Sequence, residues 1–257
     1  MTFSIIYYVI STLLFYPNQT RKETSMLRNL FSLVATLLIV APTVVAAGTT
    51  LKNELVLPYI SLTTGVVVAK GISLQTTITA SKDCDGKYCY VGVFSNYSAS
   101  RGELTELDLF MGVTHTFAEN WNTNLSVAFV TDGTEFVSLA GDVSMSRTFR
   151  YGTLTVTPKL SWMPQIASNF PNGHYVKAGA TFVLQPEATP ELSLKLQPWV
   201  VYDTGAYGAS PGVSKHLKLG AHWQLNKKSS FELGVEAHRT HDGVTNTAAR
   251  VGLVFSF

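Results

Sequence analysis

The sequence has few charged residues and few cysteines. Only 14% of its 257 residues are Asp, Glu, Lys or Arg, whereas a typical soluble domain carries about a quarter. Hydrophobic residues make up 46% of the chain, so a highly charged, disordered chain is excluded. With only two cysteines, a small fold held together by many disulfides is excluded as well. Low charge combined with many glycines and aromatic residues is typical of β-structure that faces something other than water.

Long apolar runs are confined to residues 1–47. Residues 3–16 are mostly apolar, and a second apolar segment, residues 30–45, follows a short basic start at Arg28 and ends in Ala46 and Ala47. This order predicts a secretory signal peptide over residues 26–47, cleaved after Ala47. Residues 1–25 are then an upstream extension or a misassigned start, and residues 48–257 form the mature protein. An N-terminal membrane anchor is the alternative interpretation.

The mature chain has no excess of charge of either sign. Residues 1–47 hold three of the nineteen basic residues and one of the seventeen acidic residues, which leaves sixteen of each in residues 48–257. A nucleic-acid partner would require a clustered basic face. The sequence therefore predicts no nucleic-acid partner.

From residue 55 onward, apolar and polar residues alternate in segments of about ten, separated by Gly, Asn, Asp, Pro and Ser. In residues 247–257, for example, Val251, Leu253 and Phe255 alternate with Arg250 and Gly252. A period of two is the signature of β-strands, and no helical period persists. The predicted strands lie at 57–70, 74–82, 88–97, 104–117, 121–130, 136–149, one between the turns at 150–152 and 164–173, 174–184, 192–202, 216–225, 229–239 and 247–257. The total is twelve strands, with ten as the alternative if the first two plug the barrel instead of pairing.

The apolar face of the last five strands is almost free of charge, and aromatic residues lie at both of its ends. One end has Phe182, Trp223, Phe231 and Phe257, and the other has Tyr202 and Tyr175. A soluble barrel or sandwich could show the alternation, but an apolar band between two aromatic girdles is typical of a transmembrane barrel. We therefore predict an all-β, antiparallel, up-and-down transmembrane β-barrel in the outer membrane of a Gram-negative bacterium, with outer-membrane lipids around it.

The chain ends in Val-Gly-Leu-Val-Phe-Ser-Phe. This ending resembles the C-terminal signal of bacterial outer-membrane barrels, with Phe257 as its terminal aromatic residue. The resemblance implies that the barrel-assembly machinery is a partner.

Three segments of residues 55–117 follow one another in a characteristic order. They are Ala69–Ser73 (AKGIS), Tyr90–Asn96 (YVGVFSN) and Glu106–Gly112 (ELDLFMG). This order resembles the TorF family, whose members are described as porins. Lys70 stands where that family prefers Arg, Phe94 stands where it often has Trp, and the cysteine pair is extra. The resemblance implies an outer-membrane barrel and says little about what it transports.

Cys84 and Cys89 flank the turn-forming pair Asp85-Gly86. In an oxidising compartment this spacing predicts a small disulfide that closes the hairpin. A metal site is the weaker alternative, because no histidine lies nearby in the sequence. We expect no resident metal and no cofactor.

Charged residues fall on the face opposite the apolar one, where they would line a pore. They are Lys159, Lys177, Lys195, Lys218, His222, Glu232, Glu236, His238, Arg250, Asp108 and Asp142. Four lysines on consecutive strands, opposed by carboxylates, would bias a pore toward anionic solutes. In the alternative, these groups pair across neighbouring strands and fill a narrow lumen.

Catalytic residues are not predicted. His115 falls on the lipid face, but a barrel phospholipase would need a neighbouring serine and an orienting Asn or Asp, and no such set stands out. The sequence thus predicts a non-enzymatic, porin-like channel for small polar solutes. The alternatives are a barrel without a pore that serves as a surface protein, and a lipid-modifying barrel enzyme.

Overall fold

The computed structural model describes residues 48–257, except 61–66, 70, 133–135, 169 and 207–209. The predictions of an upstream extension (residues 1–25) and a signal peptide (residues 26–47) lie outside the described residues. Within the described part of the chain, no helix is long and apolar enough to cross a membrane.

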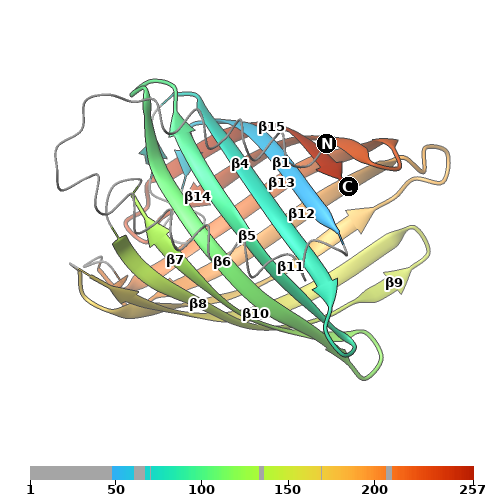
Figure 1. Cartoon of the computed structure of the whole chain (residues 1–257), viewed down its shortest axis with the longest axis horizontal. Coiled ribbons are helices and arrows are strands. Elements are labelled where there is room, and N and C mark those ends of the chain that lie inside the picture. Colours follow the sequence, from blue (N-terminus) through green and yellow to red (C-terminus); the bar gives the residue numbers. More distant parts are fainter. Residues whose placement is uncertain (1–47, 61–66, 70, 133–135, 169, 207–209) are drawn as a thin grey trace. The chain divides into compact units, whose positions relative to one another are not determined.

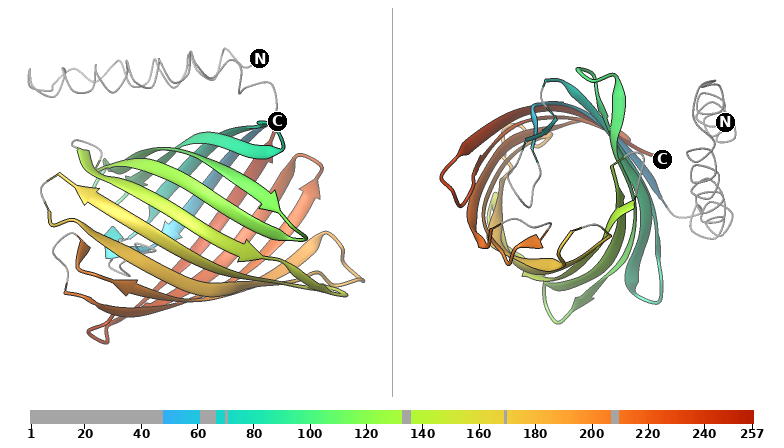
Figure 2. Two further views of the ribbon diagram at one scale, coloured as in Figure 1. Left: turned by 90° about the horizontal axis from the view of Figure 1, so that it is seen from below. Right: turned by 90° about the vertical axis from the view of Figure 1, so that its left-hand side faces the viewer.

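Twelve long antiparallel strands form one closed barrel (Figures 1 and 2). They are β1 (Thr49–Leu57), β4 (Ser73–Asp83), β5 (Lys87–Ser98), β6 (Glu103–Phe117), β7 (Trp121–Thr131), β8 (Phe136–Arg147), β10 (Leu154–Ala167), β11 (Gly173–Leu184), β12 (Leu192–Asp203), β13 (Gly212–Asn226), β14 (Ser229–Arg239) and β15 (Thr245–Ser256). Each pairs with its neighbours along the chain, with β8 followed by β10. The short strand β9 (Phe149–Tyr151) extends the sheet beside β10. The prediction of a twelve-stranded up-and-down barrel is confirmed.

The first strand, β1, closes the barrel because it pairs with both β15 and β4. Its predicted position, 57–70, was wrong. Residues 58–72 instead connect β1 to β4 and carry the two-stranded hairpin of β2 (Tyr59–Ile60) and β3 (Val67–Ala69). Asn53 breaks the alternation in β1 by placing an amide on the outward face. That amide is satisfied across the strand pair, because its Oδ1 accepts a 2.9 Å hydrogen bond from Thr76 Oγ1.

The two faces of the wall differ sharply in polarity. Large apolar side chains on the outward face are exposed, such as Leu125 (58% exposed) and Leu233 (51%). Among the described residues, buried side chains are mostly polar and point inward, including Glu236, His238 and Arg250. A soluble barrel would have the opposite arrangement, because exposed apolar patches of this extent are unfavourable in water. The outward face therefore fits the hydrocarbon of a bilayer, where a closed barrel also satisfies every backbone group.

Turns at the two ends of the barrel differ in length. One end holds the short connections at 84–86, 118–120, 148–153, 185–191 and 227–228 together with both ends of the barrel chain. We call it the periplasmic end, because short turns face the periplasm in such barrels, and the opposite end the outer end. At the periplasmic hairpin of β4 and β5, Asp85 and Gly86 both have positive φ, 55° and 74°, as a type I′ turn requires.

Parts of two connections at the outer end pack against the inner wall. Strand β2 contacts β15, and Figure 2 shows β2 and β3 inside the barrel outline. After β12, Asp203 Oδ1 accepts hydrogen bonds from the backbone N–H groups of Gly205 and Ala206, which places Ala206 on the buried side chains of Tyr175 and Val201. The prediction of Tyr175 in an aromatic girdle was wrong. Tyr175 alternates with the outward-facing Val176, and it therefore points inward.

Candidate functional site

The eleven residues predicted to line a pore all lie on the inward face of the wall. Cross-strand registers align them, for example Lys218 with Glu236 and His222 with Glu232 on β13 and β14. Their placement follows from the period of two, which puts every second side chain of a strand on one face. Neighbours across the sheet determine what each of these charges contacts.

Arg250 and Glu236 form the most enclosed ion pair. Arg250 donates from Nε and Nη2 to the Glu236 carboxylate at 3.0 and 2.6 Å, and its Nη1 lies 3.8 Å from Glu54 Oε2. Only 7% of Arg250 and 3% of Glu236 is exposed. This bidentate pair joins β14 to β15, and through Glu54 it reaches β1, so it spans the seam where the barrel closes.

A second set of charges lies on the same part of the wall. Lys52 Nζ is 2.6 Å from Glu232 Oε2 and 3.1 Å from Glu54 Oε1, and His222 Nδ1 is 3.3 Å from Glu232 Oε1. Between β1 and β14, β15 presents Gly252, where a Cβ would come within 2.9 Å of the Glu54 side chain. The missing side chain leaves room for Lys52 and Glu54 to lie across β15.

Two histidines extend this cluster toward the outer end. The rings of His216 and His238 are 4.2 Å apart and nearly perpendicular. His238 Nε2 lies 3.7 Å from Glu236 Oε1, and His216 Nε2 is 2.8 Å from Ser214 Oγ. His222 is thus joined to Glu232 and His238 to Glu236, so the two do not share one carboxylate. No group of three or more metal-ligating side chains occurs among the residues that the structure describes.

A basic patch lies on the neighbouring strands β11 to β13. It consists of Lys177, Lys195 and Lys218, and no described carboxylate oxygen lies within 4.0 Å of their ammonium groups. Lys159 on β10 differs from them, because its Nζ is 3.6 Å from Asp142 Oδ2. The inner wall therefore has a charge-paired side and a side with cations that lack a close counter-ion.

Trp199 lies in the middle of the basic patch. Lys177 Nζ is 4.4 Å from the centre of the Trp199 ring, a cation–π distance. The partner of Trp199 in β11 is Gly179, where a Cβ would come within 2.5 Å of the indole. The absence of a side chain at residue 179 lets the indole lie against the sheet, with the lysine over its ring.

Neutral polar side chains and the Asp142 carboxylate form a hydrogen-bonded network on the β5 to β8 side of the wall. Tyr90 and Thr114 donate hydrogen bonds to Asn124 Oδ1 at 2.8 and 3.1 Å, and Asn124 Nδ2 donates to Asp142 Oδ2 at 3.4 Å. Asp108 pairs with Val130 and Phe94 in the registers of β6 and lies apart from this network. The eleven predicted residues thus form separate groups.

Sequence reasoning missed Lys52, Glu54 and Trp199. Lys52 and Glu54 were missed because β1 was placed too far along the chain. Trp199 follows Pro198, and a proline blurs the strand pattern because it cannot donate to the ladder. A glycine in the preceding strand at the paired position, Gly179, was a usable signal, since such glycines often mark a close approach.

The cysteine pair differs from its prediction. Both thiols are free in the structure, so the predicted disulfide is not formed there. Cys84 stands opposite Lys87 in the turn and Cys89 opposite Lys82, so the two cysteines are diagonal neighbours.

Among the residues predicted for the aromatic girdle at the periplasmic end, Trp223 lies on β13, Phe231 on β14 and Phe257 at the barrel seam. Trp223 pairs with Phe231, and the backbone N–H of Phe257 donates a 2.9 Å hydrogen bond to Thr49 O. The side chain of Phe257 is 69% exposed. His115 faces outward, as alternation predicted, and its ring stacks on Phe117.

No family model matches the chain, and no curated protein matches it in sequence. Solved structures do match it. The NanC porin aligns with 80% of this chain and 98% of its own at 8% identity and a TM-score of 0.54, and the KdgM porin with 81% and 99% at 12% identity and 0.52. An outer membrane channel from Pseudomonas putida F1 aligns with 82% and 96% at 11% identity and 0.55. At these identities the likeness establishes the fold, so the chain folds as a twelve-stranded transmembrane β-barrel of the outer-membrane type.

Proposed function

We propose that the protein is an outer-membrane channel that lets small polar solutes cross and favours anions. The observation that carries this proposal is the basic patch of Lys177, Lys195 and Lys218 on the inward face, where no described carboxylate oxygen lies within 4.0 Å of an ammonium group. The mature chain is neutral as a whole, but its inner wall is not uniformly neutral. Cations on one side of a lumen raise the local concentration of anions.

The width of the barrel supports selective passage. A barrel of twelve strands is wider than the packed eight-stranded kind and narrower than a sixteen-stranded porin. Side chains therefore lie within reach of a small solute from several strands. We expect slow or selective permeation and not bulk diffusion.

The comparisons suggest a more specific solute class. The KdgM porin has been solved in complex with disordered oligogalacturonate, a chain of acidic sugars. In this protein, Lys177, Lys195 and Lys218 present ammonium groups that suit the carboxylates of such sugars, and Trp199 holds the Lys177 ammonium over its ring. An acidic saccharide is our first choice of solute.

The resemblance of residues 55–117 to the TorF family supports the same kind of protein, and membership of that family is part of this proposal. The proposal also includes export by a cleaved signal peptide and recognition of Phe257 by the barrel-assembly machinery in a Gram-negative cell.

Conductance with ion selectivity tests the proposal. The refolded mature barrel is inserted into a planar bilayer under a salt gradient, and the reversal potential gives the ratio of anion to cation permeability. We expect an anion preference that reverses in the double variant Lys195→Glu/Lys218→Glu. Lys215→Glu is the matched control, because Lys215 lies on the same strand and points outward.

A barrel without a pore is the second candidate. The contact of β2 with β15 and the packing of Ala206 over Tyr175 favour it, because both bring chain against the inner wall at the outer end. A folded barrel that inserts but never conducts would support this candidate and overturn the channel.

A further inference from the structure

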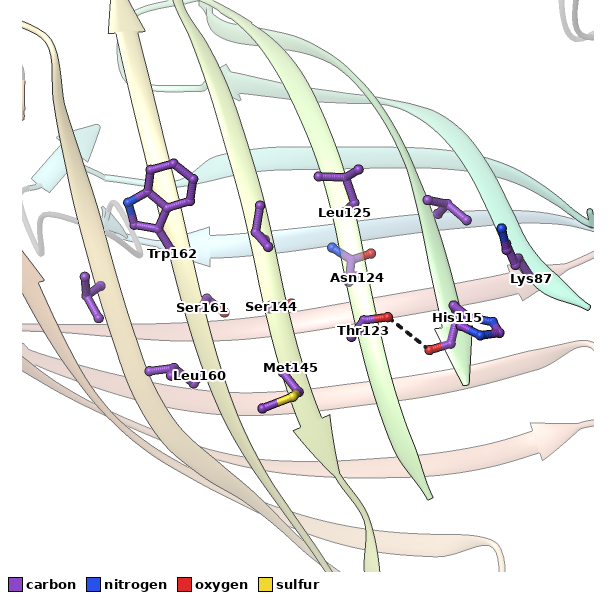
Figure 3. Close-up of a pocket in the computed structure, with 13 residues that line it drawn as sticks. Lys87, His115, Thr123, Asn124, Leu125, Ser144, Met145, Leu160, Ser161 and Trp162 are labelled. Atoms are coloured by element: carbon purple, nitrogen blue, oxygen red, sulfur yellow. Dashed lines mark hydrogen bonds between the residues drawn. The ribbon is translucent and has the colours of Figure 1, made fainter. Parts of the chain in front are cut away.

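A groove crosses the outward face of the barrel from β6 to β11 (Figure 3). Its volume is about 500 Å³. The apolar lining consists of paired residues on successive strands, namely Val113, Leu125, Val143, Trp162 and Val176, with Leu160 beside them. Because this face meets hydrocarbon, the groove has the chemistry of an acyl-chain site.

One end of the groove is polar and cationic. Lys87 and His115 pair directly across β5 and β6, and Figure 3 shows them together at the end opposite Trp162. Thr123, the cross-strand partner of His115, donates from Oγ1 to His115 O at 3.4 Å. No described carboxylate lies within 4.0 Å of Lys87 Nζ, and Asp83, the nearest acidic residue before the turn, accepts a hydrogen bond from Gly86 N–H.

Neighbouring aromatic residues place this cationic end at the membrane surface. Phe117 and Trp121 stack at 6.4 Å on the periplasmic rim, and Arg147 lies 5.4 Å from the Trp121 ring centre. Aromatic girdles of this kind mark the headgroup level of the bilayer. His115 lies two residues from Phe117 along β6, which is about 7 Å along the strand and, at a strand tilt of about 40°, about 5 Å toward the bilayer centre. This depth suits the phosphate and glycerol of a lipid.

We propose that this groove binds an anionic phospholipid of the periplasmic leaflet. An acyl chain lies along Leu125, Val143 and Trp162, and the lipid phosphate binds Lys87 and His115. An ammonium and an imidazole N–H are both donors for phosphate oxygens. This inference depends on the barrel fold alone and holds whether or not the barrel conducts.

Native mass spectrometry after reconstitution in nanodiscs of phosphatidylcholine and phosphatidylglycerol tests the site. We expect the wild-type barrel to retain phosphatidylglycerol over phosphatidylcholine about fivefold. In Lys87→Gln/His115→Gln, we expect the ratio of retained phosphatidylglycerol to phosphatidylcholine to fall to about one. The control Lys228→Gln, in the periplasmic turn between β13 and β14, keeps the wild-type ratio. Equal retention of the two lipids by the wild type, or equal loss in the control, overturns the proposal.

A second variant pair tests the apolar part without touching the cationic end. Val143→Trp fills the groove, whereas Val251→Trp adds the same bulk to the outward face of β15. We expect only Val143→Trp to abolish retention of phosphatidylglycerol. The heat-dependent shift of the barrel band on gels checks that both variants are folded. Retention by Val143→Trp equal to that by Val251→Trp contradicts the groove. Native spectra that show a dimer without bound lipid would overturn the proposal. They would identify a second copy of the chain as the occupant of the groove.

Discussion

The guanidinium of Arg250 and the carboxylate of Glu236 form two hydrogen bonds, 3.0 and 2.6 Å long, on the inner wall where the barrel closes. Both groups are almost fully buried although they face a lumen. Removing one partner of a buried pair leaves the other charge without compensation. The pair therefore makes β14 and β15 interdependent.

Glu236→Gln is expected to lower the free energy of unfolding by about 3 kcal/mol. Urea unfolding of the barrel in vesicles, followed by tryptophan fluorescence, measures this loss. Arg101→Gln serves as the control, since the Arg101–Glu103 pair is 3.5 Å long and both side chains are more than half exposed. A loss in Glu236→Gln no larger than that in the control contradicts a structural role for the pair.

Gly179→Ala is expected to displace the Pro198 carbonyl and the Trp199 indole, because a Cβ there would come within 2.3 Å of Pro198 O and 2.5 Å of the ring. We expect destabilisation of about 1 to 3 kcal/mol together with a changed tryptophan emission spectrum. Gly220→Ala is the matched control on the same face, because its Cβ would meet only Leu233 O at 3.3 Å. Unchanged emission in Gly179→Ala would show that the indole does not depend on this glycine.

Trp199→Ala tests whether the indole positions Lys177 for binding solute. We expect the concentration of digalacturonate that blocks half of the channel current to rise about fivefold, because the Lys177 ammonium loses the ring over which it lies. Trp223→Ala is the control because Trp223 faces outward. Equal block of both variants means that Trp199 does not position Lys177 for solute.

Asn53→Leu/Thr76→Val replaces an outward-facing polar pair with apolar side chains. Replacing both partners of a hydrogen bond in an apolar environment is neutral or stabilising, and we expect a gain of up to about 1 kcal/mol. The single variant Asn53→Leu gains less, because the Thr76 hydroxyl loses its acceptor. Urea midpoints of the three proteins rank them, and a double variant less stable than the single one contradicts this expectation.

Cys84 and Cys89 are expected to form a disulfide when the protein is exported to an oxidising compartment. The closed loop is short, so the stabilisation is about 2 kcal/mol or less. Alkylation with iodoacetamide before and after reduction, read by mass spectrometry, detects the bond, and Cys84→Ser leaves Cys89 reactive throughout. Full alkylation of both cysteines in protein purified from the cell envelope shows that the thiols remain free.

Much of the fold was predictable because side-chain direction in a strand is a local property. Val251, Leu253 and Phe255 had to share one face and Arg250 the other wherever the strand paired. The same rule predicted the inward face of Lys195 and Glu236 without any knowledge of their neighbours. The assignment of polar residues to the inward face failed at β1, where Asn53 faces outward and accepts a hydrogen bond from Thr76 on another strand.

The amino-acid pattern alone thus predicted a closed barrel, its strand number and the polarity of each face. Contacts between charges depended on the tertiary structure, because the stagger of neighbouring strands sets which side chains meet. Lys159 reaches Asp142, whereas Lys195 and Lys218 reach no carboxylate within 4.0 Å among the described residues. Such registers join residues far apart in the chain, as Lys52 and Glu232 are, and no local period encodes them.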